Sequence, residues 1–197
     1  MIHSKQDLKY YLQQDRIANN VTSSKLKLWM RNFVDSSSIY NFLRTLRYTE
    51  YYTNNDSAFY RMMAIVYKIR LQKISKRLGY SIPVNTCGPG LSLPHYGTII
   101  INHKARLGSF CRLHACVNIG ASGGKNEAPK IGDNVYIGPS VVIFGAITIA
   151  DNVTIGANAT LNKSCHKQNV VLAGTPAIVV KENAPSWVEL KNVNKVP

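Results

Sequence analysis

The chain has 197 residues, of which 45% are hydrophobic and 17% charged, and it carries a formal net charge of +14. That length allows one full domain with a smaller appendage, and the composition is that of an ordinary globular protein. The N-terminal residues lack the apolar run of a secretory signal, and the most apolar stretch, residues 62–69, is too short to cross a bilayer. We therefore expect a soluble, cytoplasmic protein without membrane insertion.

The positive charge favours an anionic partner such as nucleic acid, a membrane surface or a phosphorylated cofactor. Charge does not choose between these partners, and a basic, well-solvated surface explains it equally well. The four cysteines, Cys87, Cys111, Cys116 and Cys165, show no CxxC spacing of the metal-binding type. Cys111 and Cys165 fall at small-residue positions of the repeat described below, so we expect them to serve packing.

Residues 1–80 have the pattern of helices. Ser4 to Asp7 forms a capping box at the start of the first helix, and a second apolar pattern covers residues 39–46. A third helix is predicted to start at Asn55 or Asp56 as N-cap and to end before Gly79. Its apolar residues, three to five positions apart, are Phe59, Met63, Val66, Ile69, Ile74 and Leu78. Its other face is basic, which suits either a nucleic-acid helix or, as we favour, a solvated surface.

A different period begins at residue 98, where aliphatic residues recur every six positions. These residues are Ile101, Leu107, Leu113, Ile119, Ile131, Ile137, Ile143, Ile149, Ile155 and Leu161. Six fits neither the helical period of 3.6 nor the strand period of 2, and it is the signature of a β-helix. Three hexapeptides close one coil, so each aliphatic residue should stack on its equivalent 18 residues later, over roughly five coils.

The repeat lapses once, at Lys125 within the polar, Gly-rich stretch 122–130. This stretch is predicted to leave the coil as a loop, and such excursions often carry binding residues. The coil has two open ends. The helical half is available to cover one end, and residues 177–197 are available to cover the other.

Residues 79–181 resemble the hexapeptide-repeat acyltransferases, and most closely their serine acetyltransferase branch. The resemblance rests on ProHisTyrGly at 94–97, on the repeat, on AlaProLysIleGlyAspAsn at 128–134 and on AlaGlyThrProAla at 173–177. It implies a mainly β fold: a left-handed parallel β-helix over residues 81–180, after a helical region 1–80 and before a tail 181–197. It also implies a homotrimer, or a higher assembly of trimers, with acetyl-CoA bound between neighbouring prisms.

His95 matches the family's catalytic histidine. An alcohol is a poor nucleophile near neutral pH, and a neutral imidazole can accept its proton as the oxygen attacks the thioester. His114 is a second candidate, for acceptor binding or for support of His95, although it could also be a surface imidazole. Tyr96 and Glu127 are the expected acceptor-binding residues. His95, His103 and His114 lack the spacing of zinc enzymes with this fold, so we expect no metal.

The acceptor side departs from the serine acetyltransferases. The acid that orients their histidine aligns with Tyr80, and the acid before that histidine aligns with Pro94. Their Arg–His pair, which holds serine, aligns with Glu127 and Ala128. A carboxylate at this place opposes a serine carboxylate, so the chain looks more like the acetyltransferases of capsule and exopolysaccharide clusters, which act on sugar hydroxyls.

The donor side matches the family more closely. Family positions that contact CoA map onto Gly138, Ser140, Ala157, Asn158, Ala173 and Gly174. Small residues are expected there because the pantetheine arm approaches the backbone. Lys163 or Lys181 could meet the CoA phosphates.

The sequence thus favours an acetyl-CoA-dependent O-acetyltransferase that acts on a sugar or polysaccharide precursor, without a nucleic-acid partner. Two alternatives stay open. One is serine O-acetyltransferase of cysteine biosynthesis, and the other is a non-catalytic β-helix scaffold or nucleic-acid-binding module.

Overall fold

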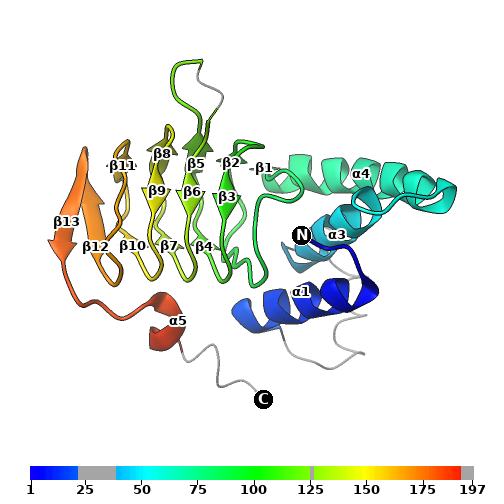
Figure 1. The fold of residues 1–197 in the computed structure, drawn as a ribbon, viewed down its shortest axis with the longest axis horizontal. Helices are drawn as coiled ribbons and strands as arrows, with labels where there is room; N and C mark the ends of the chain where they lie inside the picture. Colours follow the sequence, from blue (N-terminus) through cyan, green and yellow to red (C-terminus); the bar gives the residue numbers. More distant parts are fainter. Residues whose placement is uncertain (22–38, 125–126, 192–197) are drawn as a thin grey trace.

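The computed structural model describes residues 1–21, 39–124 and 127–191. Helices α1 (Lys5–Ala18), α3 (Ile39–Thr53) and α4 (Ala58–Leu78) come first, followed by a prism of short strands and helix α5 (Trp187–Leu190) (Figure 1). The prism is a left-handed parallel β-helix, which confirms the predicted fold class. No helix among the described residues is long and apolar enough to cross a bilayer.

Three sheets form the sides of the prism. The first sheet contains β1 (Tyr80–Ser81), β2 (Ile99–Ile101), β5 (Val117–Gly120), β8 (Val142–Phe144) and β11 (Thr160–Leu161). The second sheet contains β3 (Arg106–Leu107), β6 (Lys130–Ile131) and β9 (Thr148–Ile149). The third sheet contains β4 (Arg112–Leu113), β7 (Tyr136–Ile137), β10 (Thr154–Ile155), β12 (Val171–Gly174) and the antiparallel β13 (Ala177–Lys181). The chain passes from first to second to third sheet in each coil.

The aliphatic positions of the repeat point into the prism and are all buried, as predicted. Ile137 pairs with Ile155, which is the expected offset of 18 residues. Leu113, however, pairs with Ile137, an offset of 24 residues. The reason is the stretch between β5 and β6, whose described residues 121–124 and 127–129 form no strand and project beyond the prism in Figure 1. The predicted loop is confirmed there, while Lys125 itself lies outside the described residues.

The first coil begins before the repeat does. Tyr80 pairs with Ile99, and isolated bridges join Cys87 to Leu107 and Ser92 to Arg112. Residues 80–97 therefore complete a coil although they show no period of six. The coil can form because parallel pairing uses backbone groups, while the side chains pack on the helices instead. The Tyr80 ring, for example, meets Phe42 of α3 edge-on, with 4.9 Å between ring centroids.

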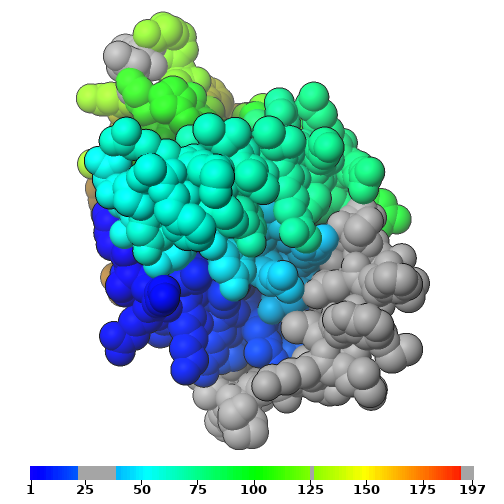
Figure 2. Space-filling view, turned by 90° about the vertical axis from the view of Figure 1, so that its right-hand side faces the viewer, coloured from blue at the N-terminus to red at the C-terminus, as the bar shows by residue number. Residues whose placement is uncertain are grey.

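The helices cover the end of the prism at which the first coil lies. Figure 2 shows α1, α3 and α4 side by side over that end. Phe42, Leu43 and Leu46 of α3 belong to the same buried cluster as the aliphatic ladder of the prism. The helical region thus closes one open end of the core, as the sequence predicted.

Helix α4 differs from the prediction in two ways. It starts one or two residues later, because Ser57 is the N-cap and accepts a hydrogen bond from the Tyr60 N–H, whereas Asp56 pairs with Arg61. Several residues expected in its core-facing stripe are also more than half exposed, namely Phe59, Val66 and Ile69. Only Ala64, Ile74 and Leu78 of α4 are buried, because most of the helix extends away from the prism (Figure 1).

The C-terminal residues do more than cover the far end. Strand β13 pairs with β12 at that end. The chain then returns along the prism, and Trp187 of α5 packs beside Ala18, Phe110 and Tyr136. The Trp187 indole N–H donates to the Phe110 carbonyl over 2.9 Å. The tail therefore reaches the coils near the helices, which the sequence did not predict.

The cysteine thiols are free, and two are buried in the prism core. Burial raises the pKa of Cys87 to about 11, and burial also raises the pKa of Cys111. Cys111 therefore serves packing, as predicted, whereas Cys165 is only partly buried.

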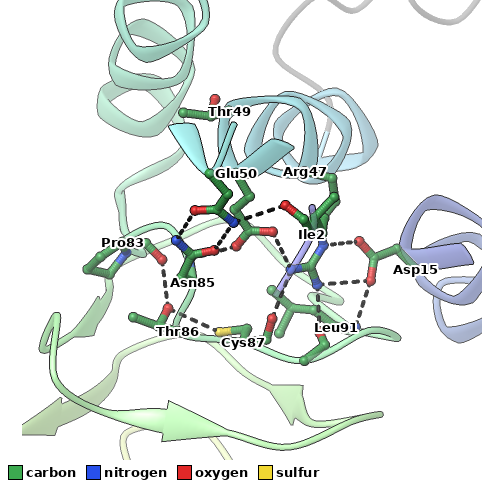
Figure 3. A network of polar contacts seen from close by, with 12 residues as sticks. Ile2, Asp15, Arg47, Thr49, Glu50, Pro83, Asn85, Thr86, Cys87 and Leu91 are labelled. Carbon is green, nitrogen blue, oxygen red and sulfur yellow. Dashed lines mark hydrogen bonds and ion pairs between the residues drawn. The ribbon is translucent and has the colours of Figure 1, made fainter. Parts of the chain in front are cut away.

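A buried ion network joins the helices to the first coil (Figure 3). The fully buried Arg47 donates to Asp15 at 2.8 Å and to Glu50 at 3.0 Å. It also donates to the carbonyls of Cys87 and Gly88, at 2.9 and 2.7 Å. Burial opposes the charge of Arg47, but the two carboxylates outweigh it and hold the pKa of the guanidinium above its ordinary value.

The two carboxylates of this network also bind the first coil directly. Asp15 accepts from the N–H groups of Gly90 and Leu91, both at 2.9 Å. Glu50 accepts from the Asn85 N–H at 2.8 Å. Residues 85–91, which lack the repeat, are therefore fixed by charged groups of α1 and α3.

We expect Arg47→Met to lower the free energy of unfolding by about 3–5 kcal/mol, because it leaves two buried carboxylates without their cation. Urea denaturation of the full chain measures this loss. The matched control is Arg61→Met, which breaks the exposed pair with Asp56 and should cost less than about 1 kcal/mol. Equal losses in the two variants would contradict the structural role of the network.

Candidate functional site

The site lies along the edge where the third sheet passes into the first. His95 is on this edge, in the segment that connects the Ser92 bridge to β2, and its side chain is exposed. His114 follows β4 in the next coil, and its ring centroid lies 5.8 Å from that of His95. Tyr136 of β7 comes next, 5.0 Å from His114. Three rings from successive coils therefore form one row, and the two predicted histidines are neighbours.

Backbone contacts hold the segment that carries His95. The Asn19 side chain, at the end of α1, donates to the Leu91 carbonyl at 2.8 Å and accepts from the Leu93 N–H at 3.0 Å. The Tyr80 hydroxyl donates to the His95 carbonyl at 2.6 Å. Tyr80 thus stands at the position that aligns with the orienting acid of the serine acetyltransferases. It fixes the backbone of His95 rather than its imidazole.

His114 is suited to a neutral role. Its Nε2 atom is buried and has no hydrogen-bond partner among the described residues. Burial, with smaller contributions from the nearby charges of Arg112, His95 and Lys191, lowers the pKa of His114 to about 4. At neutral pH His114 therefore carries no charge.

The predicted donor residues lie on the same edge, in a line that leads away from His95. Ser140 and Asn158 both have left-handed backbone conformations, with φ of 59°, at equivalent turns of two successive coils. The Ser140 N–H donates to the Ala115 carbonyl and the Asn158 N–H to the Pro139 carbonyl. These stacked turns form a narrow edge of backbone and small side chains. It includes all six small residues expected to contact CoA, Gly138, Ser140, Ala157, Asn158, Ala173 and Gly174.

Sequence reasoning missed two members of this edge. Gly156 faces Ala173, and a Cβ on Gly156 would come within 3.4 Å of the Ala173 Cβ. The Thr175 hydroxyl donates to the Asn158 carbonyl at 3.2 Å. Gly156 was visible as a repeat position, but Thr175 could be found only from its contact with the turn.

Three predicted residues lie elsewhere in the chain. Glu127 precedes β6, and Lys163 follows β11, so both are on the edge between the first and second sheets. Lys181 ends β13 opposite Val171, at the far end of this hairpin from Gly174. One chain alone therefore does not bring Glu127, Lys163 or Lys181 to His95.

A cavity of about 600 Å³ adjoins the segment that carries His95. Its walls come from the ends of α1, α3 and α4 and from the first two coils, and both Pro94 and Tyr96 line it. Tyr96, a predicted acceptor-binding residue, is 75% exposed and so is accessible from this space. Arg77, Arg112 and Lys191 also line the cavity, and none of the three was predicted as a site residue.

No metal centre accompanies these groups in the described part of the chain, where no cluster of three or more His, Cys, Asp or Glu residues could hold an ion.

Comparison with known proteins agrees with this architecture. A family profile, bacterial transferase hexapeptide (six repeats), matches residues 128–163. A search of curated proteins finds no match.

Solved structures with the same fold include serine acetyltransferases. That of Brucella abortus strain S19 has 22% identity and a TM-score of 0.70, and the alignment covers 92% of this chain and 72% of that chain. The Neisseria gonorrhoeae enzyme has 21% identity and a TM-score of 0.69, covering 93% and 70%. A serine acetyltransferase in complex with CoA has 18% identity and a TM-score of 0.66, covering 89% and 71%. At these identities the likeness concerns the fold, and both the helices and the β-helix take part in it.

The lowered pKa of His114 predicts a pH-dependent stability. From about pH 6.5, the ordinary pKa of histidine, down to about 4, the unfolded chain binds a proton at this residue that the folded chain does not. The free energy of unfolding should therefore fall as the pH falls through this window. In His114→Asn the decrease between pH 7 and pH 5, measured by urea denaturation, should be smaller than in the wild type. The exposed His103→Asn should keep the wild-type slope, and an unchanged slope in His114→Asn would contradict the account.

Proposed function

We propose that the chain is an acetyl-CoA-dependent O-acetyltransferase that acts on a hydroxyl of a sugar or polysaccharide precursor. The observation that carries this proposal is the position of His95 and His114 at the head of an edge built from small residues and stacked turns. The hexapeptide match and the CoA complex of a protein with the same fold support acetyl-CoA as donor. Use of this donor agrees with a cytoplasmic location.

The reaction needs one base and no covalent enzyme intermediate. A ring nitrogen of His95 accepts the hydroxyl proton while the acceptor oxygen attacks the thioester carbonyl carbon. The tetrahedral adduct then collapses, the C–S bond breaks, and the CoA thiolate recovers the proton from the imidazolium. Neutral His114, whose ring centroid lies 5.8 Å from that of His95, takes part in acceptor binding or supports His95. The stacked turns hold the pantetheine arm in place, which aligns donor and acceptor.

The acceptor side favours a sugar. Tyr80 binds the backbone carbonyl of His95, and Pro94 precedes that histidine, so the carboxylates that assist serine acetyltransferases are replaced. Glu127 stands where a cation would hold a serine carboxylate, and Ala128 beside it is buried and cannot donate a hydrogen bond through its side chain.

A second candidate is serine O-acetyltransferase. The likeness of the whole fold to enzymes of that name favours it, including structures solved with serine. Thiol release from acetyl-CoA separates the two functions when L-serine is compared with a panel of sugars, sugar phosphates and oligosaccharides. Activity with a sugar and none with serine is the expected result. Activity with serine alone would replace the proposal by the second candidate.

The chain is proposed to assemble as a homotrimer or as a pair of such trimers. Within one chain, Glu127 and Lys163 lie on a different edge from His95. A neighbouring prism would bring its own edge with these residues towards His95, so that each site is complete only between two copies. Sedimentation velocity should give a species of three chains or a multiple of three, and an active monomer would contradict the assembly.

His95→Ala tests the base directly. We expect turnover to fall by about 10²–10⁴ because proton removal from the acceptor is lost. CoA affinity, measured by calorimetry, should stay close to that of the wild type, since the donor residues are untouched. The control is His166→Ala, an exposed histidine between the second and third sheets, which should leave turnover unchanged. Near-normal turnover in His95→Ala would exclude this residue as the base.

A further inference from the structure

The cavity beside His95 is lined by cations from three separate parts of the chain. Arg77 is in the last turn of α4, Arg112 is in β4, and Lys191 follows α5. No Asp or Glu is among the described residues that line it, and no described carboxylate pairs with any of these three cations. Among the residues that the structure describes, the cavity therefore has a positive charge without a paired carboxylate, in a space large enough for a small-molecule ligand.

Arg112 is held in place without being neutralised. Its guanidinium donates to the Ser92 hydroxyl at 2.9 Å and lies 5.4 Å from the centre of the Trp187 ring. Its Nε atom is buried and has no partner in the described part of the chain. Burial lowers the pKa of Arg112, and burial together with the charge of Arg112 lowers the pKa of Lys191. A half-buried cation with an exposed cation nearby favours the binding of an anion between them.

The return of the tail along the prism explains how this arrangement arises. Trp187 is fixed by its hydrogen bond to the Phe110 carbonyl, and it stacks on Arg112. Four residues later, Lys191 reaches the cavity. The C-terminal segment therefore adds both an aromatic support and a second cation to a space that opens beside the base.

The cavity is separate from the edge assigned to CoA. That edge starts at Gly138, opposite His114, and leads towards Gly174 at the far end of the prism. The cavity lies at the other end, between the helices and the first coils. Donor and acceptor would thus approach His95 from opposite directions.

We propose that this cavity binds a phosphate group of the acceptor, so that the enzyme acetylates a sugar while it is attached to phosphate. This inference rests on the proposed function, because it assigns the cavity to the acceptor of that reaction. Arg112 and Lys191 bind the phosphate oxygens, Arg77 adds charge at the rim, and Tyr96 lies beside the sugar. The phosphate could belong to a sugar 1-phosphate, a nucleoside diphosphate sugar or a polyprenyl diphosphate carrier.

Inorganic pyrophosphate is the probe for a first experiment, which needs no catalysis. Calorimetry of the full chain should show pyrophosphate binding, both alone and with saturating CoA. In Arg112→Met and in Lys191→Met the affinity should fall by about tenfold or more, because a charge-assisted contact is lost. Lys191 is exposed, so its variant should fold normally even if Arg112→Met does not. Lys130→Met, the same change at an exposed position of the second sheet, should keep wild-type affinity.

Three results would overturn the proposal. If CoA abolishes pyrophosphate binding, the cations serve the donor phosphates. If Lys130→Met weakens binding as much as Lys191→Met, the attraction is a general effect of the basic surface. A lack of detectable pyrophosphate binding would also overturn the proposal, whatever the activity of the chain.

A second experiment compares the free form of one sugar with its phosphate-linked forms as acceptors. The KM for at least one phosphate-linked form, a sugar 1-phosphate, a nucleoside diphosphate sugar or a polyprenyl-linked sugar, should be at least about tenfold below the KM for the free sugar. Lys191→Met should remove this preference, while the KM for acetyl-CoA should stay constant. Comparison of the three phosphate-bearing acceptors identifies the source of the phosphate. Equal KM values for free and phosphorylated sugar would refute the assignment. Pyrophosphate binding without any acetyl transfer would instead refute the proposed function and leave the anion site standing.

Discussion

The buried charge of Arg47 is the constraint on which the geometry of the site depends. Its guanidinium has no contact with water, so it is stable only while Asp15, Glu50 and two backbone carbonyls surround it. Those groups come from α1, α3 and the first coil, so the network can form in only one relative arrangement of the three. The helices are therefore part of the framework of the site and do more than cover one end of the prism.

This constraint matters because the first coil lacks the repeat that determines the conformation of the later coils. The later coils repeat their aliphatic residues, and each coil is a template for the next. Residues 82–97 have no such repeat, yet they carry His95. Asp15 and Asn19 fix this segment instead, because their side chains form hydrogen bonds with backbone groups of residues 90–93. The proposed base thus sits where the regular solenoid meets a segment shaped by tertiary contacts.

Much of the fold could be predicted from local spacing, and the exceptions have a common cause. The period of six depends on side chains that point inward in every coil, so it is visible in the sequence and identified the buried aliphatic residues. The coil of residues 80–97, the exposed face of α4 and the return of α5 depend instead on contacts between distant segments. Arg47 directly follows the apolar pattern of residues 39–46, and that pattern gave no sign of its partners.

Some residues of the site could be predicted from the sequence and others could not, for the same reason. The small residues of the proposed CoA edge occupy fixed places in the repeat, whereas His95 belongs to the motif ProHisTyrGly, so a resemblance could transfer both by position. Arg112 and Lys191 are neighbours only because the tail folds back, and their meeting cannot be deduced from sequence separation. Glu127 and Lys163 share an edge with each other and not with His95, which a linear comparison does not reveal.

The proposed function assigns this edge a donor end and an acceptor end, joined at His95. The most direct test of this account is a crystal structure of the chain with CoA bound. The account predicts the pantetheine arm along the turns of Ser140 and Asn158, with the thiol beside His95 and His114. CoA bound away from this edge, or with its thiol remote from both histidines, would contradict it.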